Sequence, residues 1–179
     1  MSWKKDSESV SLCGGLIEEI LINIFLFEAL ENSYYLDMAK RQIHLFINKH
    51  VDEDGLVRDF NEIKSPFMTQ TAGFVKILTI FLKYDEEPKF VSLVNKMLSA
   101  IDRNFTQSFG YINGLVGIAD VLIDGYILTG QFDYLRSAHE KLYIASKIIE
   151  DDSFEYGMAG LHYVLEKVNR IEHSISEGV

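Results

Sequence analysis

The chain is poor in proline, tryptophan and cysteine. Its 179 residues include two prolines, one tryptophan and a single cysteine, Cys13. One cysteine excludes an internal disulfide framework and fits a reducing cytoplasm. No low-complexity tract or linker divides the chain, and 47% of its residues are hydrophobic. The composition therefore predicts one globular domain, residues 1–179, with enough apolar surface for a core.

Basic residues are also few. The sequence holds 17 lysines and arginines against 27 acidic residues, for a formal net charge of −10. That charge repels phosphate backbones and anionic membranes, so we expect no nucleic-acid partner. A basic peptide would be attracted to the chain. Charged residues interrupt every apolar run, so no segment is expected to span a membrane. The first ten residues hold no apolar segment that would export the chain, and we expect a cytoplasmic protein.

A motif of small and apolar residues recurs four times in the sequence. The copies are SLCGGLIEEI from Ser11, FMTQTAGFV from Phe67, YINGLVGIA from Tyr111 and FEYGMAGLH from Phe154. Their alignment places one residue of each copy in a shared column, at intervals of 55, 44 and 43 residues: Glu18, Gly73, Gly117 and Gly160. Repeats of this length are typical of helical hairpin arrays.

The residues after each motif predict the second helix of a hairpin. Positions 18, 21, 25 and 28 residues after the column are apolar in the three complete repeats, which is the spacing of an amphipathic helix. These residues are Leu36, Ala39, Ile43, Phe46, Val91, Val94, Leu98, Ile101, Leu135, Ala138, Leu142 and Ala145. The first helix of each repeat is more densely apolar, as in residues 16–30, and we expect it to be an inner helix, buried on most sides. The second helix should form an outer, half-solvated layer.

Capping signals predict where several helices begin and end. Asn32 and Ser33 form an N-cap signal, Pro88 suits a first helical turn, and Thr129-Gly130 ends one helix before Phe132 begins the next. The fourth repeat lacks a second helix. The sequence thus predicts an all-α fold of about three and a half helical hairpins.

Glycines mark the start of the inner helices. Gly15, Gly114 and Gly157 share a column, although glycine costs about 1 kcal/mol relative to alanine inside a helix. Two interpretations remain open. Either the N-termini of the inner helices crowd together and only a bare backbone fits, which we favour, or their open amides face a ligand at the centre of the array.

At these residues the chain resembles the lanthionine synthetase C-like (LanC-like) family. The similarity lies in GLVGIADVLIDGYILTGQFDYLRSAHE from Gly114, in SLCGGL, in FMTQTAGF and in the closing YGMAGLHYVLEKV from Tyr156. Each is similar to the family's repeated Gly-Leu-x-Gly-Ile helix start with its Thr-Gly and Tyr-Leu turn. The resemblance implies an α/α toroid of seven inner and seven outer helices, of which this chain would supply four inner and three outer.

The LanC-like resemblance also implies a reaction and a cofactor. The family forms thioethers: a zinc ion lowers the pKa of a peptide cysteine, and the thiolate adds to a dehydroalanine or dehydrobutyrine. Its zinc ligands are the cysteine of a Trp-Cys-x-Gly motif and the cysteine and histidine of a Cys-His-Gly triplet. Here Cys13 matches one ligand position, but Gly14 stands where the histidine belongs and no Trp-Cys pair exists. Two of three ligands are missing, so we expect a degenerate zinc site and no zinc cofactor.

Three residues are candidates for a lumen or ligand-facing site: Cys13, Asn113 and His162. Asn113 stands inside the corresponding triplet if the third repeat is the equivalent one, and His162 occupies an inner-helix column otherwise filled by apolar residues. We interpret His162 as a hydrogen-bonded core or lumen residue rather than a metal ligand. His44 and His50 lie six residues apart on an outer helix, where we expect both side chains to be solvated.

Paired carboxylates could also indicate a sugar-processing enzyme, because α/α toroids also house such enzymes and these use a carboxylate pair. Asp120 and Asp124 share one face of an inner helix, and Glu18 and Glu19 stand at the start of another. Acids at a helix N-terminus are explained by the helix dipole. The sequence shows no aromatic and basic residues around these carboxylates of the kind that a sugar-binding site requires.

Three functions remain open, so whether the chain is an enzyme is left undecided. The first is a zinc-less LanC-like protein of a lanthipeptide-type pathway that binds or shapes a peptide. The second is an active thioether-forming cyclase fragment completed by another chain, for which Cys13 would be the discriminating residue. The third is a non-catalytic helical-repeat module that binds protein.

We also expect the two ends of the helical array to be covered by a partner, either a second copy or another LanC-like chain. The first and last helices each lack one neighbour, which would expose apolar side chains. The side chains concerned are Ile20, Ile24, Phe25, Phe27, Leu161, Val164 and Leu165.

Overall fold

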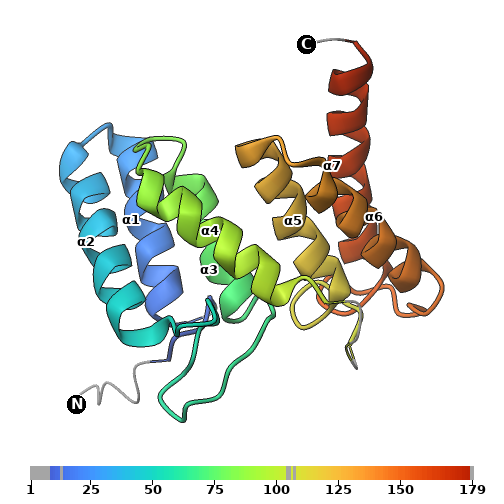
Figure 1. Ribbon diagram of the computed structural model, residues 1–179, viewed down its shortest axis with the longest axis horizontal. Helices are drawn as coiled ribbons and strands as arrows, with labels where there is room; N and C mark the ends of the chain where they lie inside the picture. The colour runs from blue at the N-terminus through green and yellow to red at the C-terminus, as the bar shows by residue number, and fades with distance from the viewer. Residues whose placement is uncertain (1–8, 13, 104–105, 107, 178–179) are drawn as a thin grey trace. The chain divides into compact units, whose positions relative to one another are not determined.

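The computed structural model describes residues 9–12, 14–103, 106 and 108–177, and these residues form α-helices joined by loops (Figure 1). The helices are α1 Leu16–Leu30, α2 Ser33–His50, α3 Thr71–Phe81, α4 Pro88–Ile101, α5 Leu115–Thr129, α6 Phe132–Ser146 and α7 Met158–Ser176. Within the described residues the only β pairing is two isolated bridges. The all-α prediction, three hairpins followed by one further helix, is confirmed.

The chain divides into two compact units. Unit 1 is Met1–Ala100 and unit 2 is Ile101–Val179. The single domain predicted for residues 1–179 stays a prediction.

Local signals set the helix ends. The Asn32 side chain accepts a hydrogen bond of 3.0 Å from the Tyr34 amide and caps α2, and α4 begins at Pro88. Gly130 follows α5 in the left-handed conformation, with φ of 70°, and its amide donates to the Tyr126 carbonyl. A left-handed residue at this position is the common way for a helix to stop. The three capping predictions are confirmed.

The outer helices bury the stripe that their sequences predict. In unit 1, α1 packs against α2 and α3, and the rings of Phe81 in α3 and Phe90 in α4 lie 5.8 Å apart. In unit 2, α5 packs against α6 and α7, and α6 against α7. Ten of the twelve stripe residues are buried, while Leu36 and Val91 are partly exposed. The 3.6-residue period was therefore a sound guide to the core faces of α2, α4 and α6.

The first inner helix differs from its prediction. Only Ile17, Ile20 and Ile24 of α1 are buried, whereas Ile22 and Phe25 each expose 50% of their surface. The expectation that this helix is buried on most sides is wrong. The apolar side chains of α1 point in all directions around the helix, but neighbouring helices cover only one of its sides. The prediction holds for α3 and α5, which are buried along most of their length.

The apolar residues predicted to be exposed at the array ends are also mostly buried. In α1, Ile20 and Ile24 pack into the core of unit 1, and in α7 Leu161 and Val164 are fully buried. Phe25 is the residue of that set that remains half exposed. Most of these residues lie on the face that each terminal helix packs against other helices of its own unit, α2 and α3 for α1 and α5 and α6 for α7.

The glycines are explained by the loop that precedes each inner helix. The Met158 amide at the start of α7 donates to the Asp151 carbonyl at 2.6 Å, which draws the loop across the helix end. A Cβ atom on Gly157 would lie 2.2 Å from that carbonyl oxygen, and one on Gly160 would lie 2.2 Å from the Phe154 carbonyl oxygen. Similar hydrogen bonds to the preceding loop are donated by the Leu16 amide to the Ser9 carbonyl and by the Val116 amide to the Phe109 carbonyl.

This geometry supports the packing interpretation with one change. The crowding comes from the loop before each helix, and not from the N-termini of other inner helices. Because loop carbonyls already accept hydrogen bonds from Leu16, Val116 and Met158, these amides are not open toward a ligand.

None of the described helices is both long and apolar enough to cross a lipid bilayer.

Candidate functional site

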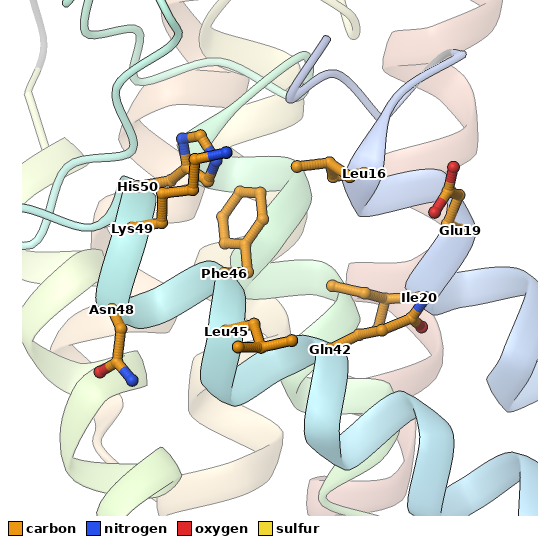
Figure 2. Close-up of a pocket in the computed structure, with 9 residues that line it drawn as sticks. All are labelled: Leu16, Glu19, Ile20, Gln42, Leu45, Phe46, Asn48, Lys49 and His50. Carbon is orange, nitrogen blue, oxygen red and sulfur yellow. The ribbon is translucent and has the colours of Figure 1, made fainter. Parts of the chain in front are cut away.

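The first hairpin carries a groove between its two helices, with a volume of about 510 Å³ (Figure 2). α1 contributes Leu16, Glu19 and Ile20, and α2 contributes residues from its C-terminal part, between Gln42 and His50. The groove lies entirely within unit 1.

The floor of the groove is apolar and anchored in the core. Ile20 and Phe46 are buried, and the Phe46 ring lies 4.3 Å from the ring of Phe74 in α3. Leu45, on the open side, exposes 69% of its surface. A rigid apolar floor with one exposed leucine can receive apolar side chains from another molecule.

The rim of the groove is polar. Figure 2 shows Glu19 and Lys49 on opposite sides of the apolar residues. The Gln42 side chain accepts a hydrogen bond of 2.9 Å from Asn23 of α1, which fixes one amide at the edge. Charges of both signs and side-chain amides at the rim would orient a ligand whose apolar side enters the groove.

His50 closes one end of the groove, and its predicted solvation is wrong. The side chain is only 3% exposed, with Nδ1 3.2 Å from the Arg58 carbonyl oxygen. Its ring lies 5.1 Å from that of Phe46 and 5.0 Å from that of Phe60. His50 lies on the buried face of α2, four residues after Phe46, and the segment after α2 folds back so that the Arg58 amide donates to the His50 carbonyl. His44 is exposed, as predicted.

Asp52 holds this returning segment in place. Its Oδ1 accepts hydrogen bonds from the amides of Asp54 at 2.9 Å and Leu56 at 2.8 Å, and the carboxylate forms an ion pair with Lys64. Burial raises the pKa of Asp52, but the hydrogen bonds from Lys64 and the two amides outweigh burial and leave the pKa below its usual value. The segment that folds back over His50 is thus held by an ionised Asp52.

The three predicted site residues are placed differently. Cys13 lies outside the described residues. Asn113 is partly exposed in the loop before α5. His162 is exposed on α7, so its interpretation as a core residue is wrong, and a ligand-facing role for the three residues stays a prediction. Across the described residues, no three His, Cys, Asp or Glu side chains are grouped as a metal site.

Asp120 and Asp124 are explained by a lysine that the sequence analysis did not single out. Lys167 of α7 places its Nζ 2.5 Å from Asp120 Oδ1 and 2.6 Å from Asp124 Oδ1. Asp120 is fully buried and also accepts a hydrogen bond of 2.9 Å from the Tyr111 hydroxyl. These groups join α5 to α7.

Glu18, by contrast, lies in the first turn of α1, where a carboxylate suits the helix dipole.

An aromatic cluster in unit 2 was also missed. The Tyr111 ring lies 5.0 Å from that of Phe154 and 5.9 Å from that of Tyr163, and the last two are 5.7 Å apart. A signal was present, because an aromatic residue opens three of the four motif copies: Phe67, Tyr111 and Phe154.

Comparisons with known proteins show the fold alone. No protein-family model matches the chain, and neither does any curated protein. The chain is similar to the solved structure of a GH76 α-mannanase from Bacteroides thetaiotaomicron, with a TM-score of 0.62 and 19% identity over 80% of this chain and 44% of that one. A Listeria innocua protein, a structural-genomics target, gives a TM-score of 0.61 and 14% identity over 78% and 45%.

The chain therefore spans less than half the length of these two structures. What it shares with them is an α/α toroid-type arrangement of helical hairpins. At these identities, activity does not follow from fold.

Proposed function

We propose that the chain is a helical-repeat binding module whose first hairpin accepts an amphipathic helix from a partner. The observation that carries the proposal is the groove between α1 and α2, with its buried apolar floor and polar rim. Its volume of about 510 Å³ is typical of ligand-binding pockets. In helical arrays the side of a hairpin is the surface against which the next helices pack, so a helix is the occupant that suits it.

The partner helix should carry basic residues on its polar face. The net charge of −10 attracts basic segments and repels acidic ones. Apolar side chains at helical spacing would enter the groove beside Ile20 and Leu45, while the polar face would meet Glu19 at the rim.

The resemblance to LanC-like proteins makes the peptide of a lanthipeptide-type pathway the first candidate partner. The toroid-type helical-repeat fold supports this choice. Binding or shaping of the peptide is the role proposed, since Gly14 replaces a zinc ligand of that family. A glycosidase is not proposed, because Lys167 engages both carboxylates on the shared face of α5.

A labelled amphipathic peptide tests the proposal. The probe is a fluorescein-labelled helix with leucines at positions i, i+3, i+4 and i+7 and with lysine and glutamine elsewhere, followed by fluorescence anisotropy. We expect binding that weakens at least about tenfold with Leu45→Glu, because a charge then enters the apolar groove. Leu30→Glu, at another half-exposed leucine of unit 1, is the matched control and should bind as the parent does.

Two results would contradict the proposal: no binding of the probe by the parent, or equal losses for both variants. A companion peptide with serine in place of leucine should not bind. If light scattering instead shows self-association that Leu45→Glu abolishes, the partner helix belongs to a second copy.

We also infer that the purified protein carries no stoichiometric zinc, because only Cys13 matches a ligand position. Elemental analysis of protein prepared without chelator measures this. One zinc per chain that disappears with Cys13→Ala would overturn the inference and favour the cyclase fragment.

A further inference from the structure

Unit 2 presents aromatic rings to solvent beside the start of α7. Phe154, in the loop before α7, and Tyr163, in its second turn, expose 45% and 50% of their surfaces. Both rings pack on Tyr111, and we call these three residues the aromatic patch. Large aromatic side chains that stay exposed while touching one another are typical of interaction sites, where they supply much of the binding energy.

Buried polar contacts of Tyr111 hold the aromatic patch in position. Tyr111 is only 9% exposed, and its hydroxyl donates to the buried Asp120, which Lys167 also engages. The rings pack edge to face, with interplanar angles of 84° between Tyr111 and Tyr163 and 63° between Phe154 and Tyr163. Because the rings are already ordered, a ligand would lose little free energy in arranging them.

The loop that carries Phe154 is strongly acidic. Residues 150–155 read EDDSFE, with four carboxylates and no basic residue, and all six are exposed. Hydrogen bonds from Ser153 hold the pKa of Asp151 below its usual value, so this carboxylate is charged at neutral pH. An anionic partner would be repelled here, and a cationic one would be attracted.

We infer that the aromatic patch binds a basic, arginine-rich segment of a partner protein. Guanidinium groups stack on aromatic faces and pair with carboxylates, so a single arginine can use both features of this surface. The rings of Phe154 and Tyr163 supply the stacking faces, and the exposed Asp152 and Glu155, in the same loop as Phe154, supply the charge. Among the described residues of unit 2, a cation already lies over an aromatic ring, with the Lys147 ammonium 5.1 Å from the ring centroid of Tyr143.

This surface is independent of the groove. The aromatic patch lies in unit 2, and no residue of the α1–α2 hairpin contributes to it. The two proposals can therefore fail separately.

The test uses a fluorescein-labelled decapeptide of alternating arginine and glycine, with a citrulline analogue as the neutral control. We expect the full chain to bind the arginine peptide and to bind the citrulline peptide much more weakly. Phe154→Leu and Tyr163→Leu keep the net charge and an apolar side chain, and each should weaken binding about three- to tenfold through loss of the ring. Tyr163→Phe keeps the ring and should bind as the parent does.

Tyr143→Leu is the matched control, because Tyr143 is an exposed aromatic residue of unit 2 outside the aromatic patch. This variant keeps the net charge and should leave arginine-peptide binding unchanged. The inference is overturned if the parent does not bind, if the citrulline peptide binds equally well, or if the two ring-removing variants bind within the error of Tyr143→Leu. Circular dichroism confirms that each variant is folded.

Discussion

α1 and α5 have the same length and similar composition, but they are buried to different extents. Both are 15-residue helices that follow a glycine in extended conformation and end at a left-handed residue. α5 buries ten of its residues and α1 only three. Their sequences predict that both are inner helices. Composition therefore indicates which side chains can be buried, and the helices packed against them determine which are.

This difference in burial indicates different roles: α5 stabilises the core of unit 2, and α1 offers a surface for binding. α5 is enclosed by α6 and α7 and is tied to α7 through Asp120 and Lys167. α1 is joined to α2 by the neutral Asn23–Gln42 hydrogen bond; it leaves Ile22 and Phe25 half exposed and lines the groove. Changes in α5 should therefore reduce stability, while changes on the open side of α1 and α2 should reduce binding.

The largest expected effect comes from removing the ionic tie of α5. Lys167→Met should cost about 3–5 kcal/mol of unfolding free energy, because Asp120 would be left buried and charged without its ammonium partner. Arg170→Met breaks a solvent-exposed pair with Glu166 on the same helix and should cost less than about 1 kcal/mol. Urea unfolding measures both. Equal costs would mean that the tie is no stronger than a surface ion pair.

The same substitution in both helices sharpens the comparison. Ile123→Ala in α5 removes a fully buried side chain and should cost about 2–5 kcal/mol. Ile22→Ala in α1 removes a half-exposed one and should cost about 0.5 kcal/mol or less. A comparable loss at Ile22 in denaturant titrations would show that α1 is covered in solution.

Glycine substitutions test whether loop contact explains the small residues. Gly160→Leu should cost about 2 kcal/mol or more, because its side chain would meet the Phe154 carbonyl. Gly130→Asn is the control: no atom lies near a Cβ there, and asparagine tolerates the left-handed conformation. The readout is the melting temperature. A Gly160→Leu protein that stays stable but loses binding would show that the backbone touches a ligand.

The smallest effect is the acid sensitivity of the segment after α2, which Asp52 holds in place. Since the pKa of Asp52 is lowered by folding, its contribution is complete above the unfolded value, near 3.8, and is lost as the pH falls through the folded value. Asp52→Asn should therefore lower stability at pH 7 and flatten the loss of stability below about pH 4. Asp54→Asn, at an exposed carboxylate of the same loop, should change the profile less. Parallel profiles for Asp52→Asn and the parent would contradict this account.

Much of the fold could be predicted from the sequence because its signals are local. The caps at Asn32 and Gly130 and the apolar stripes of α2, α4 and α6 act within a few residues, and the structure confirms them. The recurring glycines also pointed correctly to close packing, although the loops that supply it were not foreseen.

What could not be predicted depends on contacts between residues far apart in the chain. His50 continues the buried stripe of α2, four residues after Phe46, so its burial follows from the helical period; what the period does not show is that the next segment folds back over it. Lys167 reaches Asp120 across 47 residues, and no periodicity links the two. The extent to which α1 is covered depends on its neighbours and not on its own residues.

Methyl-resolved nuclear magnetic resonance tests the central claim, that the open side of the first hairpin binds an amphipathic helix. The leucine-bearing probe peptide is titrated into protein with labelled isoleucine and leucine methyl groups. The account predicts that the largest shifts occur at Leu16, Ile20 and Leu45 of the groove, while the buried Ile123 of α5 is unaffected. Shifts confined to unit 2, or no saturable shifts at these three residues, would contradict it.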